Sequence, residues 1–122
     1  LEARQAMLLA KLRSGASAAD ARLALRMATV GGAGCLGREG ELGVLAPGAV
    51  ADVAIWDLTG VQFAGAISDP IEAWLRCGPT FARDTIVAGR AVVRDGRLVS
   101  GKLDEMLTWH GKVAAAMQAP LG

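Results

Sequence analysis

Two apolar segments separated by a turn make up the stretch ELGVLAPGAVADVAIWDL, residues 41–58. Pro47 and Gly48 suit the central positions of a type II turn, because proline presets one dihedral angle and glycine accepts a positive φ. The segment after the turn contains β-branched and aromatic side chains, which favour extended backbone. The pattern predicts adjacent strands at Leu42–Leu45 and Ala51–Leu58.

Two further turns predict β-hairpins. Asp95-Gly96 lies between Ala91–Arg94 and Arg97–Val99, and it is the strongest short-range hairpin signal in the chain. Ala88-Gly89 predicts a second hairpin, whose first strand is Thr85–Val87. The three strands would form a meander with one apolar face. Such a face needs a second sheet or helices to cover it.

Helical patterns flank these strands. The first segment, Glu2–Arg13, consists mainly of strong helix formers, and Gly15 ends its pattern. Capping-box patterns precede the next two helices. The first box, Ser17–Asp20, begins a helix that is predicted to extend to about Thr29. The second box, Asp69–Glu72, begins a short helix.

The last helix is predicted at Leu103–Gln118. Gly111 weakens its middle by about 1 kcal/mol relative to alanine. Its apolar residues recur at helical spacing and form one stripe, which we expect to be packed. The stripe consists of Leu103, Met106, Leu107, His110, Val113, Ala114 and Met117.

Composition argues against several kinds of partner. The chain has 122 residues, of which 52% are hydrophobic and 20% charged, and this suits one globular domain with much apolar surface to cover. Its net charge of +1 comes from scattered residues, so we expect neither nucleic acid nor a membrane as a partner. No apolar run approaches the roughly 20 residues of a membrane-spanning helix. With no visible signal peptide and two widely separated cysteines, we expect free thiols and a cytoplasmic location.

A glycine run matches the dinucleotide-binding pattern G-x-G-x-x-G. It spans Gly32–Gly37, and Asp52 follows where an acid that binds ribose would be sought. That site requires a strand before the glycines and a helix after them, whereas a capped helix precedes them here. We therefore interpret the glycines as residues that end a helix and permit close packing. NAD binding by this run is an alternative.

Candidate metal ligands are sparse. Cys35, Cys77 and His110 offer sulfur and nitrogen donors for a catalytic zinc, but no two of them have the spacing of a binding motif. His110 is expected to be a hydrogen-bonded packing residue on its helix. Nucleophilic catalysis lacks support, because no serine or cysteine lies in a G-x-S-x-G elbow and one histidine is available as a base. We predict no catalytic, cofactor-binding or metal-binding residue in the chain.

The remaining polar and aromatic residues have structural explanations. Asp69 with Glu72, and Asp104 with Glu105, fit acidic positions at helix starts better than an acid/base pair. The three tryptophans are too widely spaced for a base-stacking platform, so core or interface packing is expected of each. They are Trp56, Trp74 and Trp109.

Several short blocks, taken in order, carry a more specific pattern. They are Ala24–Ala33, Leu36-Gly37, Leu42–Gly48, Ala51–Ala54, Asp69–Ala73, Cys77–Pro79 and Val87–Gly96. Their order resembles the C-terminal part of amidohydrolase-superfamily enzymes. It is similar to the branch that contains guanine and 8-oxoguanine deaminases, cytosine deaminases and triazine hydrolases.

The resemblance implies a parent enzyme with a metal-bearing (β/α)8 barrel and a small β-sandwich built from both chain ends. In the family, an early His-x-His pair, two later histidines and an aspartate hold the metal and the attacking water, while a glutamate moves protons. All of these motifs would precede Leu1, so no catalytic residue of the family can be carried onto a position here. Zinc or iron is implied for the parent enzyme, and none for this chain.

The predicted fold class is α+β. Helices from the end of a barrel would occupy residues 1–37, the C-terminal portion of a sandwich 38–100, and a terminal helix 101–122. The leading hypothesis is a C-terminal fragment, inactive alone, of a metal-dependent amidohydrolase that acts on C–N bonds of a purine, pyrimidine or triazine. Its expected partner is the missing N-terminal barrel part, with a homo-oligomer as a further option. The alternative is a non-catalytic, self-associating structural module.

Overall fold

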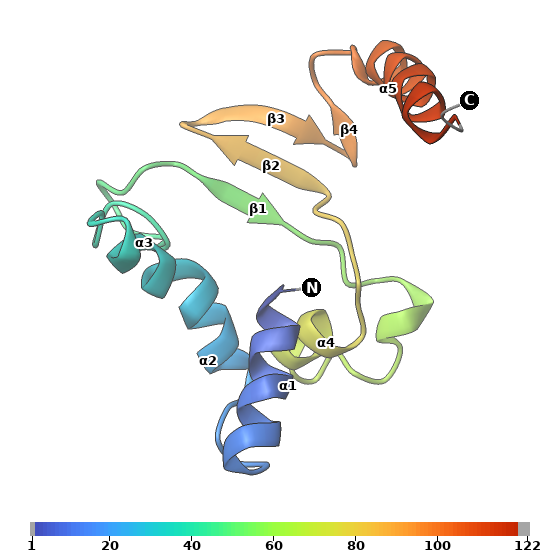
Figure 1. The fold of residues 1–122 in the computed structure, drawn as a ribbon. Helices are drawn as coiled ribbons and strands as arrows, with labels where there is room; N and C mark the ends of the chain where they lie inside the picture. Colours follow the sequence, from blue (N-terminus) through green and yellow to red (C-terminus); the bar gives the residue numbers. More distant parts are fainter. Residues whose placement is uncertain (1, 120–122) are drawn as a thin grey trace.

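The chain divides into a helical layer, a four-stranded antiparallel sheet and a C-terminal helix (Figure 1). The computed structural model describes residues 2–119, so residue 1 and residues 120–122 of the predicted ranges lie outside the described part. The predicted α+β fold class is confirmed, while the division into 1–37, 38–100 and 101–122 stays a prediction. The elements are α1 Glu2–Ser14, α2 Ala21–Arg26, η1 Met27–Gly31, α3 Gly32–Cys35, β1 Val53–Ile55, η2 Val61–Phe63, α4 Pro70–Arg76, β2 Asp84–Val87, β3 Arg90–Arg94, β4 Arg97–Leu98 and α5 Leu103–Gln118.

The second helix differs from its prediction at both ends. Its N-cap is Asp20, whose carboxylate accepts a hydrogen bond from the Leu23 amide at 2.7 Å, so the predicted cap at Ser17 is wrong. The helix also continues beyond Thr29 through the π-helical turn η1 and α3, because glycine weakens a helix interior without excluding it. The helix ends at Cys35 with Leu36 as its C-cap, and Gly37, which follows, has a φ of +65°.

The loop after this helix contains the predicted turn without the predicted strand. The Ala49 amide donates to the Ala46 carbonyl at 3.1 Å, and Gly48 has a φ of +89°, which confirms the turn. Leu42–Leu45 is not a strand, because this segment lies against the helix instead. A Cβ atom added at Gly43 would be 2.5 Å from the Thr29 carbonyl carbon. The close approach of two backbones therefore replaces strand pairing here.

The sheet has the order β1-β2-β3-β4, and all neighbours are antiparallel. The predicted hairpins are confirmed. Both central residues of each turn have positive φ, as in type I′ turns: 48° and 76° at Ala88-Gly89, and 48° and 73° at Asp95-Gly96. β1 pairs with β2, and it is shorter than predicted.

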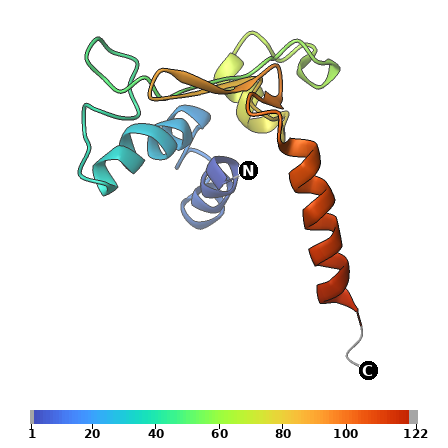
Figure 2. The same cartoon turned by 90° about the horizontal axis from the view of Figure 1, so that it is seen from above.

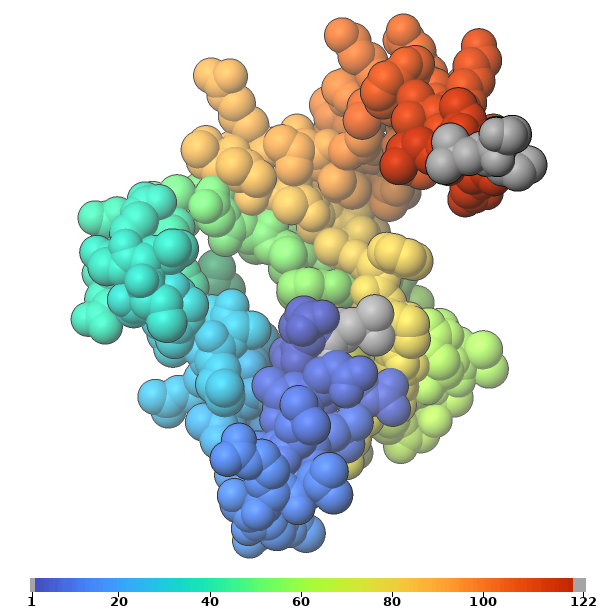
Figure 3. Space-filling view, in the orientation of Figure 1, coloured from blue at the N-terminus to red at the C-terminus, as the bar shows by residue number. Residues whose placement is uncertain are grey.

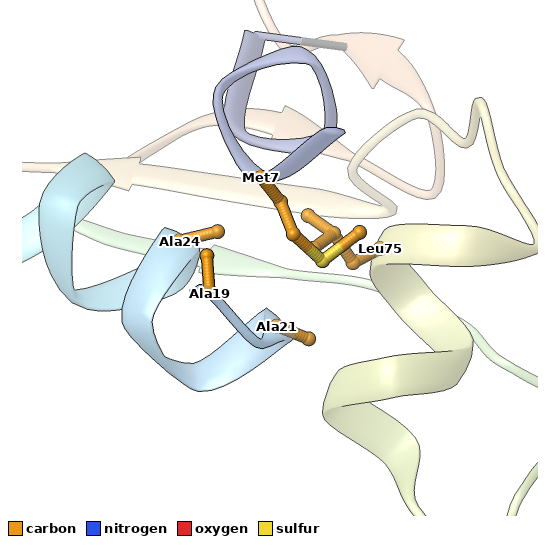
Figure 4. Close-up of a cluster of buried hydrophobic side chains, with 5 residues drawn as sticks. All are labelled: Met7, Ala19, Ala21, Ala24 and Leu75. Carbon is orange, nitrogen blue, oxygen red and sulfur yellow. The ribbon is translucent and has the colours of Figure 1, made fainter. Parts of the chain in front are cut away.

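A small core joins the helices. Met7 of α1 points between α2 and α4, where it meets alanines of α2 and Leu75 of α4 (Figure 4). The small alanine side chains allow α2 to approach closely. The cluster consists of Met7, Ala19, Ala21, Ala24 and Leu75.

Helix α5 lies apart from this core. It extends away from the end of the sheet in the view from above (Figure 2), and the space-filling view places it at one corner of the molecule (Figure 3). The predicted helix is confirmed in its bounds, but its apolar stripe is mostly exposed and contains no buried residue. His110 is exposed, so its predicted packing role is wrong. Trp109 is also exposed, at 67%, so it is not packed in the core of this chain, and interface packing stays a prediction.

Candidate functional site

The residues considered as metal ligands lie on separate parts of the fold. Cys35 is exposed at the end of α3, Cys77 is half-buried after α4, and His110 is exposed on α5. Both thiols are free. Between residues 2 and 119, no group of three or more histidine, cysteine, aspartate or glutamate side chains could hold a metal ion.

The glycine run does not form a nucleotide-binding loop. Gly32–Cys35 is helical, so its amides belong to a helix rather than to a turn that faces a phosphate. Asp52 has a structural role, because its carboxylate accepts a hydrogen bond from the Ala88 amide at 2.7 Å. This bond attaches the β2–β3 turn to the segment before β1. The NAD-binding hypothesis therefore loses both the loop and the acid on which it depended.

Carboxylates link α2 to α4. Asp69 caps α4 by accepting hydrogen bonds from the Ile71 and Glu72 amides, and it also accepts one from the Arg22 guanidinium at 2.8 Å. The Arg22 bond is the largest cause that lowers the pKa of Asp69 from its ordinary 3.8. Glu72 does not complete the predicted capping box, because it accepts from the Ala21 amide at 3.2 Å and pairs with Arg76.

These contacts make the predicted helix-start roles of the two acids partly right. The Arg76 bond is the largest cause that lowers the pKa of Glu72 from its ordinary 4.5. The link from Glu72 to Ala21 spans 51 positions and was missed from the sequence, since nothing in the local pattern marks a backbone amide as its partner. Both acids are ionised and occupied in structural bonds, which is unlike a general acid poised for proton transfer.

A small hollow lies where α1 meets the loops around α4. Its volume is about 200 Å³, and Arg4, Trp56 and Trp74 line it. The two indole rings are in contact, with centroids 4.9 Å apart and planes at 56°, as the prediction of packing roles for them required. Arg4 donates a hydrogen bond to the Gly78 carbonyl at 3.1 Å. The hollow offers stacking, one cation and the Thr80 hydroxyl, and its lining residues include no histidine, cysteine or carboxylate.

Unburied apolar surface is the most prominent feature of the chain. It exposes 9269 Å². A self-contained protein of its mass, 12.5 kDa, is expected to expose about 6,200 Å². Within residues 2–119 the buried hydrophobic residues are few and mostly small, and many large ones are exposed. The buried set is Met7, Ala19, Ala21, Ala24, Ala33, Phe63, Ala73 and Leu75.

One face of the sheet concentrates this apolar surface. Cross-strand partners lie on the same face, and Val53, Ile86 and Ala91 are such partners on β1, β2 and β3. A shallow hollow of about 350 Å³ lies on the sheet, and its lining includes the charged residues Asp84, Arg94 and Asp95 as well as Ile55, Ile86 and Ala91 of this face. We call this side of the sheet the apolar face. Its residues are Val53, Ile55, Ile86 and Ala91.

None of the helices between residues 2 and 119 combines the length and the apolar character needed to cross a lipid bilayer.

The comparisons with known proteins point to an enzyme family. The Amidohydrolase family matches residues 1–102. An 8-oxoguanine deaminase of Pseudomonas aeruginosa is 40% identical over 119 residues, which are 98% of this chain and 26% of that protein. A hydroxydechloroatrazine ethylaminohydrolase of a Pseudomonas species is 42% identical over 83 residues, 67% of this chain and 17% of that protein.

Solved structures agree with this family. Atrazine chlorohydrolase from Arthrobacter aurescens, crystallised with zinc, matches 90% of this chain with a TM-score of 0.81 and 34% identity. The match covers 25% of that enzyme. The chain thus spans about a quarter of the length of both the deaminase and the chlorohydrolase. Extended similarity in sequence and in fold leads to one conclusion: the chain belongs to the amidohydrolase family.

Proposed function

We propose that this chain is a structural part of a metal-dependent amidohydrolase that hydrolyses C–N bonds of a purine, pyrimidine or triazine. One observation carries the proposal, namely 40% identity to an 8-oxoguanine deaminase along 98% of the chain. A second relative, a 5-methylthioadenosine/S-adenosylhomocysteine deaminase of Syntrophobacter fumaroxidans, is 31% identical over 91 residues. Deamination of a nitrogen heterocycle is therefore the reaction we propose for the whole enzyme.

The metal of such an enzyme would be held outside this chain. Hydrolysis of a C–N bond requires an activated water, and a bound zinc or iron would supply it by lowering the pKa of that water. The donors of this chain do not fit such a site, because Cys35, Cys77 and His110 lie on separate elements. We therefore assign no catalytic step to any residue between 2 and 119. Zinc in the crystallised chlorohydrolase supports zinc as the metal of the whole enzyme.

The proposed role of these residues is to complete the frame around that site. The excess of exposed surface, about 3,000 Å², is larger than one side of a standard interface between proteins, which buries about 800 Å² per partner. A surface of this size fits the remaining three quarters of an amidohydrolase, which is the partner we propose.

The test compares the chain alone with a complete enzyme. The purified 122-residue chain is assayed for bound zinc and iron and for ammonia release from guanine, 8-oxoguanine and cytosine. We expect neither metal nor ammonia. In parallel, the chain replaces the matching 119 residues of the Pseudomonas aeruginosa 8-oxoguanine deaminase, and we expect this chimera to bind metal and release ammonia. Turnover by the chain alone, or a folded chimera that hydrolyses none of the three bases, would refute the proposal.

A self-associating structural module is the second candidate function. The exposed apolar side chains favour it, since surfaces of this extent drive association in water. Sedimentation of the purified chain distinguishes the two. A defined oligomer that buries the apolar face, together with a chimera that does not fold, would support the module over the enzyme part.

A further inference from the structure

Helix α5 carries an apolar stripe that no element described between residues 2 and 119 covers. The helix makes few contacts with the strands or with the other helices, and it extends away from the sheet (Figure 2). No residue of α5 is buried. Most helices in proteins owe their stability to the packing of such a stripe, so we expect α5 to pack against a partner. The stripe consists of Leu103, Met106, Leu107, His110, Val113, Ala114 and Met117.

The carboxylates and the lysine of α5 lie on the side opposite the stripe. Asp104, Thr108 and Lys112 follow one another at steps of four residues, which places them along one line of the helix, and Glu105 is beside that line. A partner that covers the stripe therefore buries none of these three charges. Two acids and one lysine also differ from the basic polar face of helices that lie on membranes. A protein surface is therefore the occupant that suits the stripe.

The match to the whole family ends where α5 begins. The Amidohydrolase family matches residues 1–102, and α5 starts at Leu103. The 8-oxoguanine deaminase, in contrast, aligns with 98% of the chain, so α5 is shared with a closer relative. The helical layer and the sheet lie within the family match. The stripe of α5 lies outside it, and this separates the partner of α5 from the frame that all members share.

The stripe is complementary to a second copy of itself. Its residues are spaced symmetrically about His110, so two α5 helices that pack antiparallel about a two-fold axis bring apolar side chains opposite one another. Trp109 is one position from that axis and 67% exposed, so it would lie beside Trp109 of the second copy. The antiparallel direction also aligns the helix dipoles favourably. The opposed pairs are Leu103 with Met117, Met106 with Ala114, and Leu107 with Val113.

We infer that α5 joins two copies of this protein through an antiparallel helix pair. The inference goes beyond the proposed function, because it concerns assembly and not the reaction. A helix of 16 residues is about 24 Å long, so the pair buries less than the roughly 800 Å² per partner of a standard interface. We therefore expect a weak dimer, with a Kd on the order of 10 μM.

The first test compares two neighbouring residues on opposite sides of α5. Leu107 and Thr108 are both exposed, so a lysine at either position leaves the fold of a single copy intact. Sedimentation velocity of the 122-residue chain from about 1 to about 200 μM measures the association. We expect Leu107→Lys to raise the Kd more than about 30-fold, because each pair would bury two charges, and Thr108→Lys to change it less than about 3-fold. Equal effects of the two lysines, or an unchanged chain that stays monomeric throughout this range, would overturn the inference.

Cross-linking tests the direction of the pair. Cys35 and Cys77 are free thiols, so both are first replaced by serine. Leu103→Cys and Met117→Cys are then made in separate chains that carry tags of different size, and the two chains are mixed and oxidised. We expect disulfides between the two variants, because positions about 21 Å apart along one helix meet only in an antiparallel pair. Disulfides that form only between like chains would show a parallel pair and would contradict the inference.

The chimera with 8-oxoguanine deaminase separates this inference from the proposed function. There we expect Leu107→Lys to release the contact through α5, measured as a lower mass in solution, and to retain ammonia release. If Leu107→Lys instead lowers the Tm of the chimera without changing its mass, the rest of the enzyme covers the stripe and the inference is wrong. A chimera that pairs through α5 yet releases no ammonia would preserve the helix pair and refute the function.

Discussion

The helical layer and the sheet are stabilised in different ways. In the helical layer, Met7 and Leu75 are buried against alanines of α2, and the acids of α4 bond to α2. In the sheet, the four strands pair in order, with a register shift between Thr85 and Ile86, but no strand residue is buried. The helices have thus made their side-chain contacts within this chain, whereas the sheet still has an uncovered face. The sheet therefore has regular secondary structure without a hydrophobic core of its own in this chain.

Truncation of a core side chain should test this contrast most strongly. Met7 is 2% exposed, so Met7→Ala removes buried contacts and leaves a cavity, and we expect a loss of about 3 kcal/mol in the free energy of unfolding. The matched change Val93→Ala on the half-buried sheet should cost less than about 1 kcal/mol in the chain alone. Urea unfolding monitored by tryptophan fluorescence measures both. Equal losses would mean that the sheet already has a core.

Gly43 tests the contact between the loop and the helix, with a slightly smaller effect. A Cβ atom there would lie 2.5 Å from the Thr29 carbonyl carbon, and the φ of +73° disfavours a side chain. We expect Gly43→Ala to destabilise the chain by about 2 to 3 kcal/mol. The control is Gly48→Ala, where φ is +89° but no atom lies within 4 Å, with an expected cost of about 1 kcal/mol. Thermal unfolding of both variants decides whether the close approach matters beyond the backbone angle.

The Asp95-Gly96 turn and Gly43 show where prediction from sequence succeeded and where it failed. Asp95-Gly96 determines its hairpin through its own dihedral angles, so the prediction needed only neighbouring residues. Leu42–Leu45 has a strand-like composition, but the close approach of Gly43 to Thr29 decides its structure, and that contact joins separate elements. Local chemistry was therefore predictable, and long-range contact was not.

The candidate site follows the same division. The meander could be predicted from its turns and from the alternation of half-buried and exposed residues along β3, such as Ala91 and Val92. The link from Glu72 to the Ala21 amide could not, because a backbone amide carries no sequence signature. The exposure of His110 was also missed, since a helical stripe predicts that a face will be covered without saying which polypeptide covers it.

Acid should loosen the helical layer before the hairpins. The Asp69 pKa is lowered chiefly by Arg22, which is 47 positions away, whereas the Asp84 pKa is lowered chiefly by its neighbour Arg83. A lowered pKa in the folded state adds stability above the ordinary value of 3.8, and that stability is lost as the pH falls through the lowered value. Loss at Asp69 weakens the link between α4 and α2, whereas after loss of the Asp84 bonds to Arg83 and to the Asp95 amide the backbone pairing of β2 with β3 still holds that region.

The measurement is hydrogen exchange of α2 and β2 amides between pH 5 and about pH 3, corrected for the intrinsic rate. We expect α2 to lose protection first. Asp69→Asn keeps a capping side chain and removes the charge, so it should flatten the acid dependence in α2 and leave β2 unchanged. Simultaneous loss in both regions would show that the sheet depends on the helical layer.

The smallest expected effect concerns α5, which belongs to neither region. Gly111 lies in its middle, and an added Cβ would have no atom within 4 Å. Gly111→Ala should therefore stabilise α5 by up to about 1 kcal/mol through helix propensity alone. Because α5 lies apart from the core, amides of α5 should gain protection from hydrogen exchange while those of α1 and β3 do not change. If protection also rose in the sheet, α5 would contact the sheet in solution and would partly cover the strands.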